Sequence, residues 1–217
     1  MNEYQDKKQI IYPILTPKEY SLFLKKGKII PRKINRISIH DSGHPSDKKK
    51  QLGSLGKRLG ALILPPKKRI GNNKKIAILE GLEDALTLRG VFEEHTFVIT
   101  CQKNGFDHAE AFLESDNYSE CLIIADHDLD EDAVQTSQSK AFRLGRRCMS
   151  KCTKVDVKMP SEPKFDANDA LMKSKLDDWI SALIPIPKRF QIEVPQGYES
   201  DPRTSIVVKV AAAEDEN

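Results

Sequence analysis

Three short acidic clusters recur along the chain, and carboxylates at such spacing can bind divalent metal ions. They occupy residues 80–84, 126–128 and 166–169. Hard cations such as Mg²⁺ prefer carboxylate oxygens, and they keep waters and substrate phosphates as their remaining ligands. The clusters therefore predict metal-dependent phosphate chemistry, with Mg²⁺ or Mn²⁺ as the cofactor.

The first two clusters each follow an apolar run of strand length. These runs are Lys75–Leu79 and Cys121–Ala125. Continuous apolar runs are typical of parallel strands that are covered by helices on both faces. Carboxylates directly after them would lie at the carboxyl edge of the sheet, where open α/β sheets bind their ligands.

The part of the chain from residue 74 alternates between strand and helix patterns. We expect strands at 75–79, 96–100, 121–125 and 154–158, and helices at about 82–89, 107–114, 132–146 and 169–183. This alternation predicts right-handed βαβ units. The expected fold is α/β: a compact Rossmann-like domain with a parallel sheet of about four strands flanked by helices.

Three regions are expected along the chain. Residues 1–73 form a small basic α+β segment, with a short helix from a capping box at Thr16, strands at 37–40 and 62–64, and a Gly/Ser/Lys-rich loop over 41–60. Residues 74–184 form the catalytic domain. Residues 185–217 form an extended tail with candidate strands at 189–194 and 205–210 and a disordered end at 211–217.

Length and composition fit one α/β domain with a smaller appendage. The chain has 217 residues, of which 39% are hydrophobic. It lacks an apolar stretch near the ~20 residues that span a bilayer, and its first residues lack the order of a signal peptide. We therefore predict a cytoplasmic protein without membrane contact.

Charge is strongly segregated along the chain. Residues 25–75 contain sixteen Lys or Arg against two Asp, whereas residues 76–217 contain sixteen Lys or Arg against 27 Asp or Glu. Clustered basic residues attract phosphate backbones without regard to sequence. The basic segment is either a merely solvated lysine-rich surface or, as the neighbouring acidic clusters favour, a nucleic-acid contact.

The four cysteines do not indicate a disulfide framework. Cys101 and Cys121 lie in apolar runs and are expected in the core. Cys148 and Cys152 could supply half of a zinc site with two histidines, His40 and His44, although neither spacing is a strong zinc signature.

The motifs resemble the Toprim domain that topoisomerases, primases and some nucleases share. The similarity lies in Ile78–Leu86, with its Glu80-Gly81, and in Ile124–Asp128 some forty residues later. The D-x-N-D element of phage- and plasmid-type primases is similar to Phe165–Leu171. The segment that precedes the Toprim domain in those primases is similar to residues 51–56 together with residues 60–64. The resemblance covers about residues 50–172 and combines three pieces in the right order.

Two strand ends supply the expected catalytic residues. Residues i and i+2 of an extended strand point the same way, so Asp126 and Asp128 are expected as metal ligands, with His127 facing elsewhere. Glu80 ends the neighbouring strand and is expected as a metal ligand or general base. The resemblance implies that Asp84 belongs to the same metal cluster, although an acidic residue is favourable at a helix N-terminus in any case.

Other candidates remain open. Asp166 and Asp169 could bind the metal or a nucleotide, or serve only as an Asx-turn and helix N-cap. Lys103 could contact a phosphate. Lys50, Lys57 and Arg58 could hold template or triphosphate, although no spacing distinguishes them from surface residues.

The resemblance implies a DNA primase-like nucleotidyltransferase that makes primers on single-stranded DNA from nucleoside triphosphates, as in phage or plasmid replication. A P-loop is absent, so a separate helicase is the expected partner. Two alternatives remain: a Toprim nuclease, which would use the same carboxylates with water as nucleophile, and a non-catalytic nucleic-acid-binding remnant of a larger primase.

Overall fold

The structure is a computed structural model. It describes residues 9–28, 33–38, 51–55, 60–68, 74–129, 136–188, 198–200 and 207–209. A six-stranded sheet forms its centre, in the order β4-β6-β5-β7-β8-β9. The strands are β4 (Leu62–Leu64), β5 (Lys75–Leu79), β6 (His95–Ile99), β7 (Glu120–Ile124), β8 (Lys154–Met159) and β9 (Ile184–Pro185).

The sheet is mixed. The four central strands β6, β5, β7 and β8 are parallel, as the alternating pattern predicts. The edge strands β4 and β9 are antiparallel to their neighbours, so the expectation of a purely parallel sheet was wrong. A two-residue edge strand such as β9 carries too little local pattern to be detected, because its pairing depends on the strand beside it.

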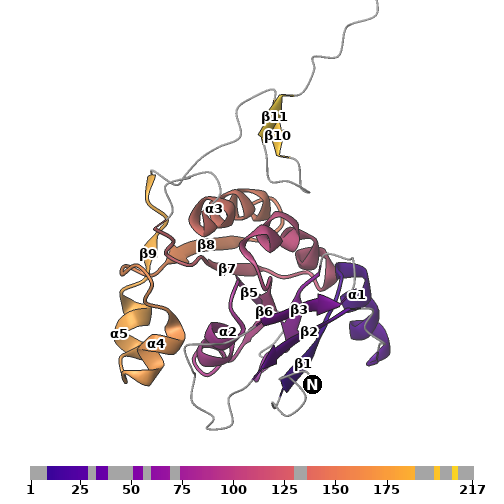
Figure 1. The fold of residues 1–217 in the computed structure, drawn as a ribbon. Helices are drawn as coiled ribbons and strands as arrows, with labels where there is room; N and C mark the ends of the chain where they lie inside the picture. Colours follow the sequence, from indigo (N-terminus) through magenta and orange to yellow (C-terminus); the bar gives the residue numbers. More distant parts are fainter. Residues whose placement is uncertain are drawn as a thin grey trace, which may run out of the picture.

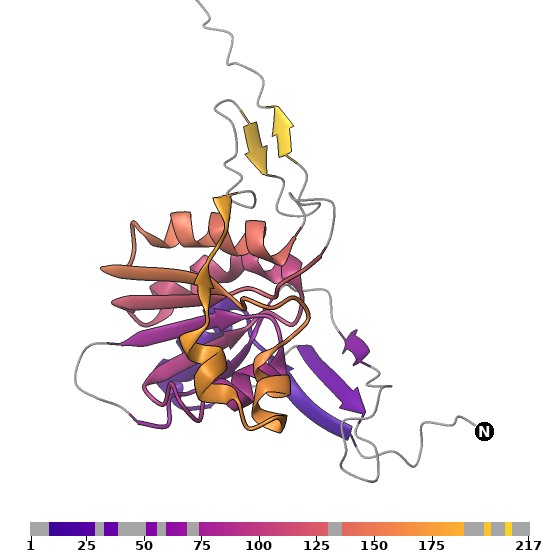
Figure 2. The ribbon, with the colours of Figure 1, turned by 90° about the vertical axis from the view of Figure 1, so that its left-hand side faces the viewer.

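Helices cover both faces of the sheet (Figures 1 and 2). One face packs against α2 (Leu82–Leu88), α4 (Ala167–Met172) and α5 (Leu176–Ser181). The other packs against the 3₁₀ helix η1 (Lys103–Ser115) and α3 (Ser137–Cys148). Side chains alternate along β5: Ile76 and Ile78 enter the α3 side of the core, and Ala77 and Leu79 enter the α2 side. The α/β class is therefore confirmed.

The N-terminal part forms a second, smaller sheet. Its antiparallel strands β1 (Gln9–Ile14), β2 (Lys33–Ser38) and β3 (Gln51–Leu55) are joined in chain order. The strand β3 lies within 41–60, where we expected only a loop, so that expectation was wrong for 51–55. Helix α1 (Pro17–Lys26) follows β1 and begins with the predicted capping box: Thr16 Oγ1 accepts from Glu19 N–H, and Glu19 Oε2 accepts from Thr16 N–H at 2.9 Å.

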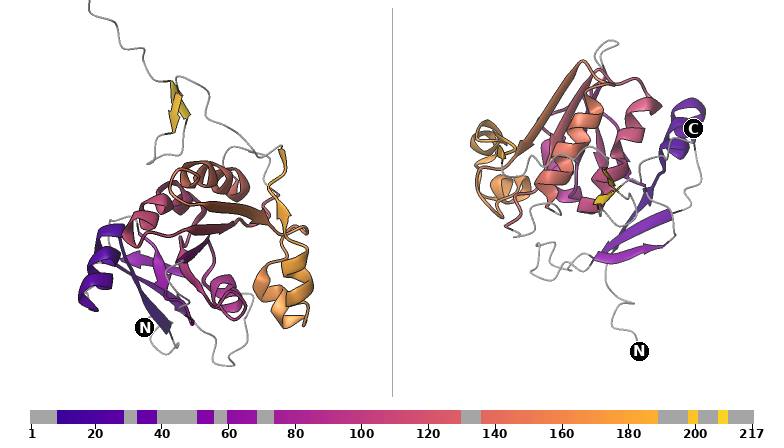
Figure 3. Two further views of the ribbon diagram at one scale, coloured as in Figure 1. Left: turned by 180° about the vertical axis from the view of Figure 1, so that it is seen from behind. Right: turned by 90° about the horizontal axis from the view of Figure 1, so that it is seen from above.

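The N-terminal part also joins the large sheet at its β4 edge, and both views of Figure 3 show it, in indigo to purple, beside the sheet. Leu15 and Ala61 exchange two backbone hydrogen bonds of 2.8 and 2.9 Å at the start of β4. The hydroxyls of Tyr20 in α1 and Tyr118 beside β7 lie 2.9 Å apart and are buried. Residues before position 74 therefore contribute directly to the core of the main domain.

Three predicted helices differ from the observed ones. The helix predicted at 107–114 corresponds to the 3₁₀ helix η1. Its buried residues Phe106, Ala109 and Phe112 repeat every three residues, which is the period of a 3₁₀ helix. The helix predicted at 132–146 corresponds to α3, which begins at Ser137. Residues 130–135 lie outside the described ranges. The single helix predicted at 169–183 is in fact two helices, α4 and α5, which are separated at Ser174 (φ 56°).

The C-terminal part is described only in short pieces. Strands β10 (Tyr198–Ser200) and β11 (Val207–Lys209) pair antiparallel, and β11 lies within the predicted 205–210. The predicted strand at 189–194 and the end at 211–217 lie outside the described residues. Among the described helices, none combines the length and the apolar character that crossing a bilayer requires.

Candidate active site at the carboxyl edge of the sheet

The acidic clusters meet at one edge of the large sheet, as predicted. Glu80 follows β5, and Asp126 and Asp128 follow β7, the strand next to β5. Asp84 lies in the first turn of α2, and Asp166 is the N-cap of α4. Clusters that are far apart in the sequence are thus brought to the same place by parallel pairing.

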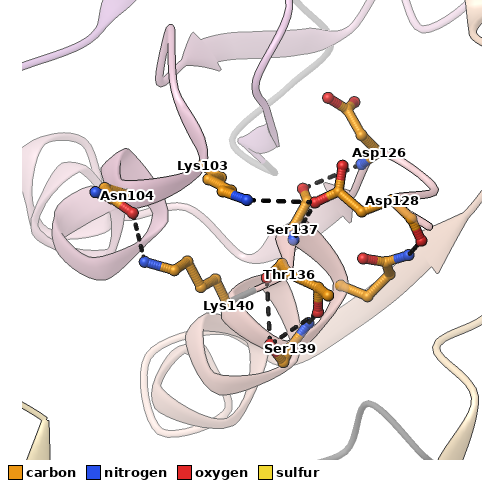
Figure 4. Close-up of polar contacts among 9 residues, drawn as sticks. Lys103, Asn104, Asp126, Asp128, Thr136, Ser137, Ser139 and Lys140 are labelled. Carbon is orange, nitrogen blue, oxygen red and sulfur yellow. Dashed lines mark hydrogen bonds and ion pairs between the residues drawn. The ribbon is translucent and has the colours of Figure 1, made fainter. Parts of the chain in front are cut away.

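Ser137, the first residue of α3, holds both aspartates of the second cluster (Figure 4). Its backbone N–H donates to Asp128 Oδ2 at 2.9 Å, and its Oγ accepts from Asp126 N–H at 3.2 Å. The Ser137 hydroxyl also donates to the Glu80 carboxylate, which accepts a second hydrogen bond from Lys103 N–H. Lys103 Nζ lies 4.0 Å from Asp128 Oδ2. Both strand ends are therefore fixed against the start of α3.

The D-x-D spacing led us to expect that the Asp126 and Asp128 carboxylates point the same way. This expectation was wrong. The Asp128 carboxylate faces Ser137 and Lys103, whereas that of Asp126 points away from them (Figure 4). The reason is that β7 ends at Ile124, so both residues lie on irregular backbone beyond the strand, where the alternation of strand side chains no longer holds.

The start of α3 is buried and hydrogen-bonded. Thr136 is the N-cap, and its Oγ1 accepts from Ser139 N–H at 3.2 Å. Gln138 Nε2 donates to the backbone oxygen of Asp128 at 3.0 Å. The Thr136 contact satisfies one of the N–H groups that a helix N-terminus otherwise leaves without partners. The Gln138 contact joins α3 to the Asp126–Asp128 turn.

Lys140 ties α3 to the loop that carries Lys103. Its side chain is 0% exposed, and its Nζ donates to Asn104 Oδ1 at 2.5 Å and lies 3.4 Å from Asp107 Oδ2. Burial lowers the pKa of the Lys140 ammonium, and the Asp107 carboxylate opposes that shift. Because Asn104 directly follows Lys103, this buried lysine helps to hold Lys103 at the site (Figure 4).

The third acidic cluster is tied to the first. Asn168 N–H donates to Asp84 Oδ1 at 3.1 Å, and Asp169 N–H donates to Asp166 Oδ1 at 2.7 Å. Gly81 lies close to this carboxylate: a Cβ on it would lie 2.6 Å from Asp84 Oδ2, so a larger residue would require the Asp84 side chain to move. The N-cap interpretation of Asp166 is therefore correct, and Asp169 lies in the first turn of α4.

The carboxylates raise one another's pKa values. Burial, and then the charge of Asp128, raises the pKa of Glu80 to about 7. Burial and Asp166 raise the pKa of Asp84 to about 7. The pKa of Asp126 is also raised to about 7, by desolvation and by Glu80, Asp128 and Asp166, although part of its side chain remains exposed to water. Like charges within one site disfavour ionisation, so these carboxylates form one electrostatic unit.

A cavity of about 260 Å³ lies next to this site. Its lining includes four carboxylates, those of Asp84, Asp126, Asp128 and Asp166, and several apolar side chains, among them Leu88, Ile124, Leu129, Phe165 and Trp179. Glu80 and Lys103 are not part of this lining. The cavity is therefore lined by acidic and apolar groups together.

The donor chemistry suits a hard divalent cation, since all of these groups supply carboxylate oxygens and a cation would relieve their repulsion. Within the described ranges, however, three or more such side chains do not converge closely enough to form a ready metal-binding group. The residues present fit a metal by their chemistry and charge, and they would need to rearrange to hold it.

Several sequence candidates lie elsewhere. Lys50, Lys57 and Arg58 fall outside the described residues, as do His40 and His44. Cys121 is buried in the core as expected, and Cys148 is buried as well, whereas Cys101 and Cys152 are half-buried. His127 contacts Pro160 through Nδ1, at 3.0 Å from the backbone oxygen.

Sequence reasoning missed Ser137, Lys140, Phe165 and Trp179 as parts of the site. Thr136 followed by Ser139 is a weak capping signal that would have placed the start of α3 correctly. Phe165 begins the Phe165–Leu171 motif, but the motif alone does not place its ring in a cavity. Lys140 and Trp179 carry no local signal, because only the packing of distant elements brings them to the site.

Comparison with known protein families finds no matching family model, and comparison with curated proteins finds no significant relative.

Proposed function

We propose that the protein is a Toprim-type nucleotidyltransferase, similar to phage and plasmid DNA primases, that joins nucleotides on single-stranded DNA. The observation that carries this proposal is the meeting of Glu80, Asp126 and Asp128 at the ends of two adjacent parallel strands. Carboxylates from neighbouring strand ends are suited to phosphoryl or nucleotidyl transfer assisted by metal ions.

The proposed cofactor is Mg²⁺ or Mn²⁺. Asp126 and Asp128 would hold it, together with Asp84, which shares their charge coupling, and Glu80 is either a further ligand or the general base. When bound, the cation would supply charge neutralisation for the triphosphate and would acidify an attacking hydroxyl.

Glu80 is the proposed general base. A base is most effective when its pKa lies near the working pH, and before a cation binds the pKa of Glu80 is about 7. The hydrogen bonds from Ser137 and from Lys103 N–H orient its carboxylate. Glu80 would take the proton from the 3′-hydroxyl of a growing primer as that oxygen attacks the α-phosphate of the incoming nucleotide, with pyrophosphate leaving.

Lys103 is the proposed phosphate contact. Its ammonium lies 4.0 Å from Asp128, on the side of the site that faces η1. The basic segment 25–75 would hold the template by phosphate contacts. A separate helicase as partner and a cytoplasmic location complete the proposal.

A primer-synthesis assay tests the proposal. The full chain is incubated with single-stranded DNA, labelled nucleoside triphosphates and Mg²⁺ or Mn²⁺. We expect extended products, and we expect Glu80→Gln to lower turnover by about 10²–10⁴, the usual scale of general acid–base assistance. Asp177→Asn, at an exposed position on α5, is the matched control and should leave turnover unchanged.

The same assay separates the alternatives. Shortened template without extended product would identify a nuclease that uses the same carboxylates. Retained DNA binding without either product would identify a non-catalytic remnant. Equal turnover of Glu80→Gln and the wild type would remove Glu80 from the mechanism.

A further inference from the structure

A second cavity, also of about 260 Å³, lies over β7 and β8, and we call it the distal cavity. The apolar residues of its lining include Phe92, Leu122, Ile180 and Leu183, all of which pack against the part of the core on the α2 side of the sheet. Its lining has no residue in common with the lining of the cavity next to the carboxylate site. The distal cavity is therefore a separate candidate site.

Strand β8 presents charged side chains to the distal cavity. Val155 and Val157 pack against the core on the α3 side of the sheet. Because strand side chains alternate, Lys154, Asp156 and Lys158 lie on the opposite face, and all three line the cavity. Strands of a parallel sheet are typically apolar on both faces, since helices cover both. Charged side chains at such a position need polar partners.

The acidic residues of the lining already have basic partners. Asp156 Oδ2 lies 3.3 Å from Lys154 Nζ, and Glu120 Oε1 lies 3.7 Å from Lys75 Nζ. Lys158, in contrast, is half-buried, and within the described ranges its ammonium forms no ion pair. An anionic group in the cavity would compensate this charge.

The rest of the lining suits a flat, apolar body. Phe92 and His95 form an edge-to-face pair of rings, with centroids 5.4 Å apart and planes at 72°. Burial, and then the charge of Lys75, lowers the pKa of His95, so its ring is uncharged at pH 7. Ile180 and Leu183 add aliphatic surface. The volume lies just below the ~300–1,000 Å³ that is usual for ligand pockets, so the ligand must be small.

We propose that the distal cavity binds a small aromatic carboxylate, with the anionic group at Lys158 and the apolar body against Leu122 and Leu183. Such a ligand matches both the charge and the apolar surface of the lining. The inference goes beyond the proposed function and does not depend on it, because neither the site carboxylates nor Lys103 belongs to this lining. The chain would thus carry two ligand sites on one sheet.

Two probes of the same shape test the proposal on the full chain by calorimetry. The first is 2-naphthoate, an anion with a flat apolar body, and the second is 2-naphthamide, its neutral counterpart. We expect 2-naphthoate to bind with a Kd of about 1 mM or tighter. It should bind about two- to tenfold more tightly than 2-naphthamide, the range of one ordinary hydrogen bond.

Single substitutions then separate the charge from the apolar contact. Lys158→Gln should weaken 2-naphthoate binding by about two- to tenfold and leave 2-naphthamide binding unchanged. Lys164→Gln is the matched control, because it removes the same charge from the lining of the other cavity. Leu183→Ala should weaken both probes by about two- to fivefold through lost apolar contact. Leu171→Ala, exposed on α4, should have no effect. Urea unfolding checks that each variant is folded.

Several outcomes would overturn the inference. Absence of 2-naphthoate binding at about 1 mM, or equal affinity for the two probes, would do so. Equal losses in Lys158→Gln and Lys164→Gln would mean that 2-naphthoate does not bind in the distal cavity. Tighter binding of 2-naphthylmethylamine, a cation of similar size, would show a site for amines instead. None of these results bears on primer synthesis, so the proposed function is tested separately.

Discussion

The backbone N–H of Asn168 donates a hydrogen bond to the Asp84 carboxylate, 3.1 Å away. This bond joins the start of α4 to the first turn of α2, across 84 positions of sequence. Asp84 thus has a structural contact as well as its place among the site carboxylates. A change at Asp84 should therefore be felt in α4 as well as in the site.

Asp84→Ala should loosen the start of α4. The Asn168 amide loses its acceptor, so its hydrogen exchange should accelerate by about two- to tenfold, since a typical hydrogen bond contributes about 0.5–1.5 kcal/mol. The measurement is amide exchange followed by NMR. Asp178→Ala, exposed on α5, is the control. Unchanged exchange at Asn168 would show that the bond does not restrain α4.

The stability of the protein should fall as the pH rises from about 4 to about 7. The pKa values of Glu80, Asp84 and Asp126 are raised to about 7 in the folded protein, so the folded state holds these protons more tightly than the unfolded state. Deprotonation therefore favours unfolding, and the effect is complete about one pH unit above the folded pKa of about 7. Urea unfolding at pH 5 and pH 8 measures it.

A variant with Glu80→Gln, Asp84→Asn and Asp126→Asn is the reference for this pH effect. It should lose less stability between pH 5 and pH 8 than the wild type, because the three groups that titrate have been removed. If the wild type and the variant changed in parallel, the pH dependence would come from other groups.

Asp126 and Asp128 should differ in their contribution to stability. The Asp128 carboxylate accepts the N–H of Ser137 at the start of α3, so Asp128→Ala should cost about 0.5–2 kcal/mol, as for other helix N-terminal acceptors. The Asp126 carboxylate accepts no hydrogen bond from the described residues and has a raised pKa, so Asp126→Ala should keep or increase stability at pH 8. Urea unfolding of both variants compares them; equal losses would contradict the asymmetry.

Lys140 and Asn104 should be energetically coupled. Lys140→Met removes a buried charged donor from Asn104 Oδ1 and should destabilise the fold by about 1.5–3 kcal/mol. Asn104→Ala should then have little further effect in the Lys140→Met background. A double-mutant cycle from urea unfolding gives the coupling free energy, which we expect at about 0.5–3 kcal/mol. Additive effects would mean that the hydrogen bond between them contributes nothing.

DNA binding should depend on the basic segment. The triple substitution of Lys50, Lys57 and Arg58 by Gln should weaken single-stranded DNA binding. The slope of log affinity against log salt should become shallower by about 0.7 for each phosphate that the variant no longer neutralises. Fluorescence anisotropy at several salt concentrations measures both. Deletion of residues 1–73 is not a suitable test, because Ala61 and β4 are built into the main domain.

The matched control for this experiment replaces three basic residues of the acidic part of the chain by Gln, namely Lys151, Lys154 and Lys188. It changes the net charge by the same amount. If both triple variants lost affinity equally, binding would follow the overall charge and not the basic segment.

Local pattern was enough to predict the parallel centre of the sheet. The apolar runs of β5 and β7 and the start of α2 were placed within one residue, because each run is long and its strand or helix is well buried. The meeting of Glu80 with Asp126 and Asp128 followed from parallel pairing. Ligand binding at the carboxyl ends of the strands is a general rule of α/β folds, so this part of the site was accessible from sequence.

The parts that were missed depend on contacts between distant elements. The role of Ser137 depends on where α3 begins relative to the end of β7, which no local pattern specifies. In the sequence, Lys140 cannot be distinguished from an ordinary lysine on a helix surface. It is buried only because η1 packs over it. The different directions of Asp126 and Asp128 depend on where β7 ends, and strand ends are the least predictable feature of a sequence.

Both edge strands of the large sheet are short and limited in how they can pair. β9 contains Pro185, which has no N–H to donate; β4 has three residues, its start is joined to Leu15, and Pro65 and Pro66 follow it directly. An unprotected edge strand is a template for strand addition by another molecule, and short edge strands and proline both reduce that risk. These features leave little backbone at either edge for another sheet to join.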